Sequence, residues 1–534
     1  MKHIRLIFAA ILLLGSLNAH ADYKIQKIDS VSGTVTDTDG HPLEGVVVSD
    51  GYQAVATASD GTYSLTYKPA AYYVHCSIPS GYEVPMRNGQ PMFYRKIDDR
   101  AKTYDFILKP LKSEEKSFSL FVIGDPQPQN PSHVRRMQEE GIADIKAYSR
   151  RQKGSCYAIT MGDLGYSEGG RNTNYLMPLV REAFRSDNTG MPVFHTVGNH
   201  DFDYAQAGLD RNNPTPTLRR DRMYECVFGP VDYSWNRGDV HFVTMNNVHF
   251  EDLETSSNYH IGISDEQLEW LREDLSFVPK DRMIVMTVHI PIAGKDDANS
   301  REAVRLIGEF KEAVIFSGHT HTSFKNFHPN GVRELTVAAL SGCWWWSRLC
   351  SDGTPQGYLV CHFDGAHMTD HIYKASCFKE SYQMRIYRGD AEFGGQYDME
   401  KLPFGHDALL VNVWNWEKGD ALEFYENGKL AGTLTRPMPK SEGLYPDTES
   451  SKDWWAIGYH IGVVGRGPGN RRRNYCPACT HMFLYRMKDP DAKVKVVFKD
   501  NYGRKFTETH IFETDEYKTY ADPPQYDRDN AWIY

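Results

Sequence analysis

The feature that most constrains this chain is a series of short apolar runs between residues 117 and 365, separated by stretches with the pattern of amphipathic helices. The runs cover residues 118–123, 157–161, 193–197, 241–245, 283–288 and 314–316, and the helical candidates between them include 132–150 and 174–185. Short, continuously apolar strands that alternate with helices are typical of sheets buried on both faces. This part of the chain is therefore predicted to be an α/β domain.

Five of these runs end in a residue type that binds metal ions. The residues are Asp125, Asp163, Asn199, His289 and His319, and in four of the five cases a glycine stands directly before the ligand type. A residue without a side chain allows a sharp turn and a close backbone approach. Because open α/β sheets build their sites at the carboxyl ends of strands, these side chains are expected to meet.

Each of these residues also has a purely structural interpretation. An aspartate can cap a helix or stabilise a turn, an asparagine can form an Asx-turn, and a buried histidine can be satisfied within a core. Five strand ends that all carry aspartate, asparagine or histidine favour a metal site instead. The last run continues as Gly318-His319-Thr320-His321, which places two imidazoles on one turn.

Length and charge limit the remaining possibilities. A chain of 534 residues is expected to form about three or four domains. Apolar residues make up 40% and charged residues 24% of the chain, which is typical of soluble globular proteins. The formal net charge of −10 argues against nucleic acid as a partner, because such binding depends on neutralising phosphates.

The N-terminus has the pattern of a signal peptide. Lys2 and Arg5 precede an apolar run over residues 6–17, and Ala19-His20-Ala21 provides a cleavage site. The run is too short to span a bilayer comfortably, and no other stretch is long enough, so no transmembrane anchor is expected. We expect residues 1–21 to be removed and the protein to be exported to a bacterial periplasm or the extracellular space.

Two further domains are predicted around the central one. Residues 22–112 contain short alternating strands with Asp39-Gly40 and Asp60-Gly61 turns, which predicts an N-terminal β-sandwich. Residues 113–370 form the α/β domain, in which Ser264 and Gln267 make a capping box that opens a helix. Residues 371–534 are predicted to be all-β, with strands at 408–414, 421–425, 455–459 and 494–498.

Nine cysteines all follow the predicted cleavage site. Cys343 and Cys350 flank a short loop, and Cys476 and Cys479 form a C-x-x-C motif. Structural disulfides are the leading interpretation for both pairs in an exported protein, although spacing does not establish the connectivity. A redox role for the second pair is the alternative.

In their order along the chain, the motifs resemble those of the calcineurin-like metallophosphoesterases, which include the purple acid phosphatases. They are Gly124-Asp125-Pro126-Gln127, Gly162-Asp163, Gly198-Asn199-His200-Asp201, His289 and Gly318-His319-Thr320-His321. The N-terminal segment resembles transthyretin-like, carboxypeptidase-regulatory-like modules, and the C-terminal one resembles a domain paired with such enzymes in secreted bacterial proteins. The resemblance implies a four-layer α/β/β/α sandwich for the central domain.

The resemblance also implies a centre with two divalent metal ions, whose identity among Mn, Zn, Fe and Mg is open. Asp163 would bridge the ions, one of which would be completed by Asp125, Gln127 and His321, and the other by Asn199, His289 and His319. Gln127 stands where the family usually has histidine, and an amide oxygen is a poorer donor to zinc than imidazole. His200 would contact the transferred phosphoryl group or the leaving-group oxygen, and Asp201 would orient His200.

Two tryptophans and one tyrosine near these motifs have two interpretations each. Tyr166 would be either a ligand to ferric iron, as in purple acid phosphatases, or a side chain that packs beside the site. Consecutive tryptophans follow the last motif, and neighbours on a strand point in opposite directions. Trp344 and Trp345 are predicted to form a stacking surface for a substrate, with burial against the C-terminal domain as the alternative.

The expected function is hydrolysis of phosphate mono- or diesters through in-line attack by a hydroxide generated at the metals. The substrate would be a small-molecule or envelope-derived phosphoester. One alternative is a degenerate phosphoesterase fold that binds a glycan or another envelope component without turnover. A nuclease is the nearer alternative among enzymes, and the acidic net charge argues against it.

Overall fold

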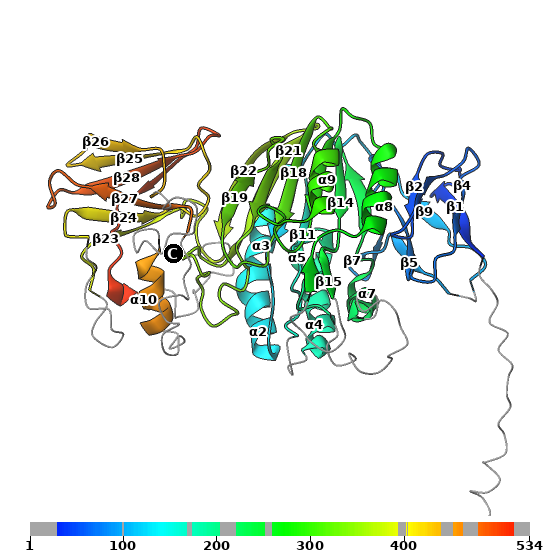
Figure 1. The fold of residues 1–534 in the computed structure, drawn as a ribbon, viewed down its shortest axis with the longest axis horizontal. Helices are drawn as coiled ribbons and strands as arrows, with labels where there is room; N and C mark the ends of the chain where they lie inside the picture. The colour runs from blue at the N-terminus through cyan, green and yellow to red at the C-terminus, as the bar shows by residue number, and fades with distance from the viewer. Residues whose placement is uncertain are drawn as a thin grey trace, which may run out of the picture.

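The computed structural model describes residues 29–98, 101–167, 173–202, 220–250, 259–392, 402, 404–438, 452–462 and 479–516. The expected signal peptide lies outside these residues. A β-rich N-terminal region, an α/β central region and a β-rich C-terminal region follow one another along the long axis of the molecule (Figure 1). Within the described ranges, no helix has the length and apolar character needed to cross a bilayer.

The N-terminal region contains two small sheets that share one hydrophobic cluster. One sheet has the order β4-β1-β9 and the other β3-β2-β5-β8. Their bounds are β1 (Ser30–Asp37), β2 (Val47–Ser49), β3 (Ala54–Ala56), β4 (Thr62–Thr66), β5 (Tyr73–Cys76), β8 (Tyr94–Lys96) and β9 (Phe106–Leu108), with the hairpin β6 (Met86–Arg87) and β7 (Gln90–Pro91) beside them. Val31, Leu65 and Val74 are buried in the shared cluster, as the alternating pattern predicts.

The central region contains two larger sheets. The five-stranded sheet has the order β12-β11-β10-β21-β22, and the six-stranded sheet has the order β13-β14-β17-β18-β20-β19. The first comprises β10 (Ser117–Ile123), β11 (Ser155–Thr160), β12 (Val193–His195), β21 (Gly357–Asp364) and β22 (Met368–Ala375). The second comprises β13 (Tyr233–Arg237), β14 (Val240–Thr244), β17 (Met283–Thr287), β18 (Glu312–Ser317), β19 (Phe324–Phe327) and β20 (Arg333–Thr336). All six apolar runs in this part of the chain are strands.

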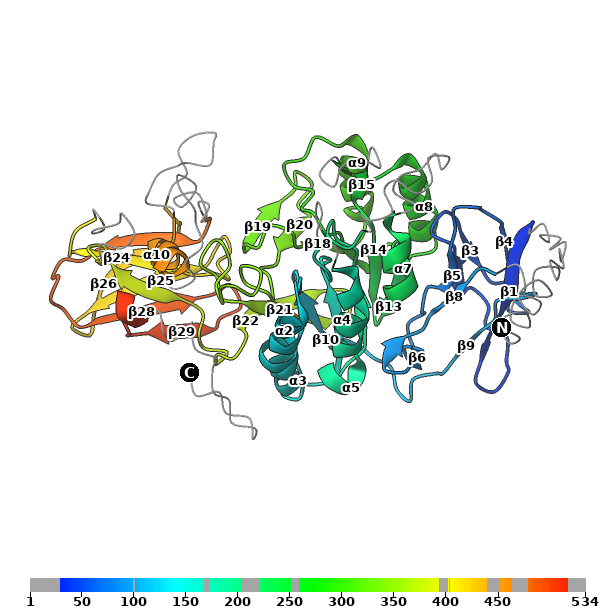
Figure 2. The same cartoon turned by 90° about the horizontal axis from the view of Figure 1, so that it is seen from below.

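The helices lie on opposite sides of these strands (Figure 2). On one side are α2 (Pro131–Arg136), the π-helix η1 (Met137–Ile142), α3 (Ala143–Ser149), η2 (Asn174–Leu176), α4 (Met177–Ala183), α5 (Ser186–Thr189) and α7 (Arg222–Phe228). On the other are α8 (Asp265–Ser276) and α9 (Ala298–Ile307), with the short pair β15 (Val248–Phe250) and β16 (Tyr259–Ile261) nearby. The capping box of Ser264 and Gln267 is confirmed at the start of α8.

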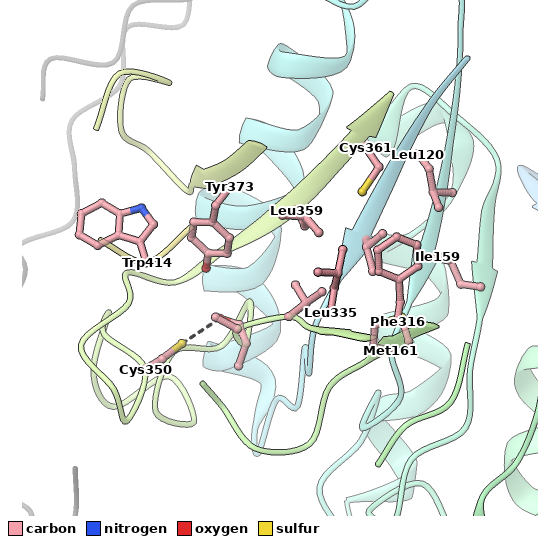
Figure 3. Close-up of a cluster of buried hydrophobic side chains, with 14 of the residues drawn as sticks. Leu120, Ile159, Met161, Phe316, Leu335, Cys350, Leu359, Cys361, Tyr373 and Trp414 are labelled. Atoms are coloured by element: carbon pink, nitrogen blue, oxygen red, sulfur yellow. Dashed lines mark hydrogen bonds between the residues drawn. The ribbon is translucent and has the colours of Figure 1, made fainter. Parts of the chain in front are cut away.

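A large hydrophobic cluster lies between the two central sheets. Leu120 and Ile159 of the five-stranded sheet meet Phe316 and Leu335 of the six-stranded sheet (Figure 3). The next residue along β10, Phe121, faces the opposite side and belongs to the cluster beneath the helices. Both faces of β10 are therefore buried, which explains why its sequence is apolar without alternation. Packing on both faces holds the carboxyl ends of the strands in fixed positions.

The C-terminal region is β-rich but includes a helix. Its two sheets contain β23 (Arg385–Arg388), β24 (Ala408–Asn412) and β27 (Met482–Arg486), and β25 (Ala421–Glu426), β26 (Lys429–Leu434), β28 (Val494–Lys499) and β29 (Lys505–Glu508). The strand predicted over 455–459 is wrong, because this run lies in α10 (Trp454–Gly462). Periodicity does not separate a buried helix from a buried strand in a run this apolar. Asp453 Oδ1, 3.1 Å from the amide of Ala456, accepts a hydrogen bond at the start of the helix.

The cysteine prediction also needs correction. Cys343 and Cys350 do not form a disulfide. The thiol of Cys350 donates to Ala339 O at 3.6 Å (Figure 3), and Cys343 Sγ lies 3.7 Å from Ser351 Oγ. Cys476 lies outside the described residues. The central sheet also continues past residue 370, because β22 pairs with β21 as far as Ala375.

Candidate metal centre

The ends of the central strands bring all seven predicted ligands into one buried region. β10 and β11 are parallel neighbours and end together, with Ile123 opposite Thr160, so the first two motifs leave the sheet side by side. β17 and β18 are likewise parallel neighbours, and they lead into the motifs of His289 and His319. These motifs therefore lie at the carboxyl ends of the strands, which is the edge of the sheets where the site is predicted.

The backbone at these strand ends adopts a conformation that is rare for residues with side chains. Ten described non-glycine residues have a positive φ, and five of them are predicted ligands. These are Asp125 (33°), Gln127 (38°), Asp163 (52°), His319 (69°) and His321 (51°). Such backbone strain is concentrated at functional sites, where the surrounding packing holds it in place.

One half of the centre is formed by Asp163, Asn199, His289 and His319. Asn199 Oδ1 lies 2.9 Å from His289 Nε2 and 2.8 Å from His319 Nδ1, and the two imidazole nitrogens are 3.3 Å apart. Asp163 Oδ1 is 3.2 Å from His289 Nε2. The ligand atoms of Asp163, His289 and His319 all lie within 4.8 Å of one another, which is close enough to share one ion.

The other half contains Asp125, Gln127 and His321, on the opposite side of Asp163. His321 Nε2 lies 3.8 Å from Asp125 Oδ1, and Gln127 Nε2 donates to Asp163 Oδ2 at 3.1 Å. The amide oxygen of Gln127 is buried and has no hydrogen-bond partner among the described residues. An unsatisfied buried oxygen is costly, and a hard cation at this place would satisfy it. The donor set of carboxylate, amide and imidazole groups therefore fits a divalent metal.

Two backbone carbonyls determine which nitrogen of the imidazoles faces the centre. His289 Nδ1 lies 2.6 Å from Met161 O, and His321 Nδ1 lies 2.8 Å from Gly342 O. A carbonyl only accepts, so each Nδ1 carries the hydrogen, and in the neutral ring Nε2 presents its lone pair to the centre. Metal-binding histidines are oriented in this way by a partner on their other nitrogen.

The buried charges perturb one another strongly. Burial opposes a charge on His289, but the carboxylate of Asp163 outweighs this effect and raises the pKa of His289 to about 9. Burial lowers the pKa of His319 to about 3, and the charge of His289 contributes to this shift. Burial raises the pKa of Asp125 well above its ordinary range. A bound divalent cation would favour the ionised carboxylates and the neutral imidazoles of His289 and His319 together.

The glycines before the ligands are required by close contacts within the centre. A Cβ at position 198 would lie 2.1 Å from the amide nitrogen of Asp163, and a Cβ at position 162 would lie 2.5 Å from His289 Nδ1. At position 318 it would lie 2.7 Å from Asp125 Oδ2. The expectation of a close backbone approach at these glycines is confirmed.

His200 borders the centre, but the role expected for Asp201 is corrected. His200 Nδ1 lies 2.9 Å from Ser167 O, and its ring stacks on Tyr166 with centroids 4.9 Å apart. The carboxylate of Asp201 instead accepts hydrogen bonds from the amides of Gly165 (2.7 Å) and Gly198 (2.8 Å). It therefore ties two motif loops together, while Ser167 orients the imidazole of His200. The stacking favours the interpretation of Tyr166 as a packing residue.

The two tryptophans predicted to bind substrate have different surroundings. Trp345 is 2% exposed, and its Nε1 donates to Pro126 O at 2.7 Å, so it helps to hold the loop of the first motif in place. This burial contradicts a stacking role for Trp345. The Trp344 ring lies beside the ligand His321, with centroids 4.9 Å apart, and it is only partly buried.

Backbone atoms at the centre could not be identified from the sequence. The carbonyls of Met161, Ser167 and Gly342 orient three imidazoles, yet every residue has such a carbonyl. No residue type signals this use. Their positions become evident only when the strand ends are assembled.

Models of one family match three consecutive segments of the chain. The model described as the N terminal of calcineurin-like phosphoesterase matches residues 29–111, the model of calcineurin-like phosphoesterase itself matches 118–323, and the model of its C terminal matches 334–506. The central match contains all seven candidate ligands, five of them before its last motif, and ends just after His321. A comparison with curated proteins found no match.

Several solved structures are similar over part of the chain. A dimetal phosphatase from Danio rerio is 14% identical, with 49% of this chain and 96% of that one covered and a TM-score of 0.32. A purple acid phosphatase from yellow lupin (Lupinus luteus) seeds is 12% identical, with 61% and 54% covered and a TM-score of 0.33. A 5'-nucleotidase precursor from Thermus thermophilus is 11% identical, with 73% and 88% covered and a TM-score of 0.29. With TM-scores this low, these similarities support no argument about the site.

Proposed function

Because the chain belongs to the calcineurin-like phosphoesterases, metal-dependent hydrolases with a dimetal centre, we propose that it hydrolyses mono- or diesters of phosphate on small molecules after export from the cell. One observation supports the proposal most directly. The acceptor atoms of Asn199, His289 and His319 converge within 3.3 Å of one another in a buried place, with Asp163 between them and the second group of donors. A fold kept only for binding would not need to retain such a set.

The proposed ligands divide into two sets that share Asp163. Its Oδ1 faces His289 and its Oδ2 faces Gln127, so one carboxylate reaches both halves of the centre. Asn199, His289 and His319 would hold one ion, and Asp125, Gln127 and His321 would hold the other. Bound divalent ions would withdraw charge from the phosphate oxygens and lower the pKa of a coordinated water to about 7.

The surrounding residues would position the substrate and keep the ligands in place. His200 is fixed through its Nδ1 by Ser167 O, which leaves Nε2 to contact the phosphoryl group or the departing oxygen. A positioned imidazole contributes roughly 10²–10⁴-fold to proton transfer in such reactions. Asp201 would keep the loops of Gly165 and Gly198 together and would act as a positioning residue. Trp344 would border the entrance beside His321.

We also infer a four-layer α/β/β/α arrangement for the central domain. Separate hydrophobic clusters lie between the sheets, beneath the α2–α4 side and beneath α8 and α9, which supports this layering. The domain limits expected from the sequence, at residues 21, 112 and 370, remain proposals. Export to the periplasm or beyond is supported by the pattern of residues 1–21 alone.

Metal analysis and an activity panel test this function together. The protein is purified without chelator, its metals are counted by mass spectrometry, and turnover of p-nitrophenyl phosphate and bis-p-nitrophenyl phosphate is measured. We expect two equivalents of metal and turnover that EDTA abolishes and metal restores. Asp163→Asn should remove activity while the far-ultraviolet circular dichroism stays unchanged. A folded protein with no metal and no turnover after supplementation with Mn, Zn, Fe or Mg would favour the binding-protein alternative.

A further inference from the structure

A cavity of about 310 Å³ lies where the N-terminal β-rich region meets the central region. Asp50, Tyr52 and Tyr72 line it from the N-terminal side, and Asp221 and Asp232 line it from the central side. Its volume is in the range of small-molecule sites. None of the seven candidate metal ligands, all of which the structure describes, lines this cavity.

Hydrogen bonds between the two regions hold the wall of the cavity at α8. Trp270 Nε1 donates to Ser49 Oγ at 2.8 Å, and Ala54 N donates to Glu273 Oε2 at 3.0 Å. Both N-terminal partners lie within a few residues of Asp50 and Tyr52. The relative position of the two walls is therefore supported by direct contacts.

The cavity is strongly acidic. The described residues that line it include five carboxylates and no lysine or arginine, the carboxylates being Asp50, Asp221, Glu225, Asp232 and Glu266. Glu225 is paired with Arg222 at 2.7 Å. Asp50 and Asp232 accept hydrogen bonds from neutral amides only, among the contacts of the described residues. Burial lowers the pKa of the lining His249, so that its neutral form is favoured and it does not balance these charges.

Asp221 is the least satisfied of these carboxylates. It is 3% exposed, and its Oδ1 is buried without a hydrogen-bond partner among the described residues. It precedes α7 but does not cap it with its side chain. Burial and the charge of Glu225 raise the pKa of Asp221 well above its ordinary range, so a cation beside it would be needed to keep it ionised. An unpartnered buried carboxylate is destabilising unless a cationic or hydrogen-bond-donating group compensates for it.

The spacing of the carboxylates argues against a metal ion in this cavity. Among the described residues, three or more ligand atoms lie within 4.8 Å of one another only at Asp163, His289 and His319 and at the exposed residues Asp37, Asp39 and His41. The acidic side chains of the cavity are therefore too dispersed to coordinate one ion. A ligand of several atoms can reach more than one of them.

The aromatic side chains of the cavity favour a cationic ligand. Arg222 and Lys96 already lie over the ring of Tyr72, at 4.3 and 4.6 Å from its centroid. Tyr52 lines the cavity with Asp221 and Asp232, and burial together with their charges raises the pKa of its hydroxyl. Carboxylates next to an aromatic ring are a typical environment for ammonium groups.

We propose that this cavity binds a small organic ammonium ion. Its N–H groups donate hydrogen bonds to the carboxylate of Asp221, and its remaining atoms lie along Asp50, Tyr52 and Asp232. The ammonium group donates up to three hydrogen bonds and supplies the positive charge that the lining residues lack. This site is separate from the phosphoesterase centre and does not depend on the proposed function.

Calorimetric titration of the full mature chain with putrescine and spermidine tests the proposal. We expect saturable binding of one equivalent to the wild-type protein. Asp221→Asn preserves the shape and removes the charge, so it should weaken binding at least tenfold while metal content and hydrolysis stay the same. Asp296→Asn makes the same change at a side chain that is 99% exposed, and it should leave amine binding unaltered.

A second variant protects the test against misfolding. Asp232→Asn retains an oxygen for Asn246 N and for the Gln267 side chain, and it should also weaken binding of the amines. Amine binding should raise the melting temperature of the wild-type protein more than that of either variant. The proposal is overturned if the folded wild-type protein binds neither amine at millimolar concentration, or if both variants bind them as tightly as the wild type.

Discussion

Gln127 is the residue that most distinguishes this centre from the pattern the chain resembles. Its amide nitrogen donates to Asp163 Oδ2, while its oxygen is buried without a partner among the described residues. Because an amide oxygen is a harder and weaker donor than imidazole, it favours Mg²⁺ or Mn²⁺ over Zn²⁺ at this half of the centre. The two halves are therefore expected to differ in metal affinity.

Replacing Gln127 tests this difference directly. Gln127→His should increase zinc affinity at one of the two sites by about 10–100-fold, which is the range that changes in the residues around metal ligands produce. Histidine tolerates the positive φ of 38° at this position better than most residues. Competition with a chromogenic chelator measures the change, and Gln127→Ala should shift the same site in the opposite direction. Equal zinc affinity in all three proteins would show that residue 127 is not a ligand.

At the scale of elements, the turns after the strands control the centre. Gly198 is the clearest case, because its Cα packs against the loop of Asp163 and a Cβ would come within 2.1 Å of the amide nitrogen there. The neighbour is backbone, which cannot move aside as a flexible side chain can. Crowding at this turn would push the loops of Asp163 and Asn199 apart.

Gly198→Ala should therefore reduce metal content and hydrolysis together. We expect a loss of about 1–3 kcal/mol in unfolding free energy, as for other overpacked sites, and metal binding weakened by more than tenfold. Gly40→Ala is a suitable control, since alanine would be strained at the φ of 85° there but would meet open space. The control should lose some stability and keep its metal. Normal metal binding in Gly198→Ala would contradict the importance of this close approach.

The π-helix η1 connects the central helices to the loop that follows the last motif. Glu140 of η1 pairs with Arg136 (2.8 Å) and with Arg348 (3.0 Å). Burial alone would raise the pKa of Glu140, but the two guanidinium groups outweigh it and lower the pKa to about 2. Because the folded-state pKa is depressed, the stabilisation is complete above about 4.5 and is lost as the pH falls toward 2.

Glu140→Ala should lower the unfolding free energy at pH 7 by about 3–5 kcal/mol, because it leaves Arg348 buried without its carboxylate partner. The difference from wild type should shrink as the pH falls from 4.5 to 2.5. Urea midpoints at a series of pH values measure it, with the exposed neighbour variant Glu139→Ala as the reference. A difference that stays constant with pH would show that the ion pairs do not stabilise this loop.

The elements themselves show where sequence reasoning succeeds. The runs around Leu120, Ile159 and Phe316 are strands buried on both faces, as their continuously apolar pattern predicts. The residues that follow such runs are the predicted metal ligands, and the structure brings them together. Residues 455–459 form a helix and not the predicted strand, because a uniformly apolar run fits both structures equally well; the cap at Asp453 is the signal that favours the helix. Contacts between distant segments, such as Asp201 with Gly165, depend on the assembled loops and leave no pattern in the sequence.

At the scale of the whole molecule, the C-terminal region is joined to the loop of the last metal-ligand motif. The carboxylate of Asp352 accepts a hydrogen bond from Ser323 N at 2.6 Å and lies 3.0 Å from His481 Nε2. Ser351 N donates to the carbonyl of His321 at 3.0 Å. Burial opposes a charge on His481, but Cys479 and Asp352 outweigh it and raise the pKa of His481 to about 10. The C-terminal region therefore contributes to the position of His321.

Asp352→Ala should disturb the metal centre although residue 352 is not a ligand. Removing the carboxylate leaves the buried His481 without its acidic partner and the Ser323 amide without its acceptor, at an expected loss of about 3–5 kcal/mol in unfolding free energy. Metal content should fall from two equivalents toward one, because His321 belongs to only one half of the centre. Mass spectrometry and hydrolysis rates measure both effects.

Asp370→Ala provides the matched control for this junction. Asp370 pairs with Arg504 at 2.9 Å and so also joins the central and C-terminal regions. Among the described residues, its side-chain contacts are with His362, Thr369 and Arg504, which lie outside the His321 loop. Both variants should weaken the attachment of the C-terminal region, whereas only Asp352→Ala should lower metal content. If both lose metal equally, the centre depends on the docking of the whole C-terminal region. If neither does, the His321 loop is held by the central region alone.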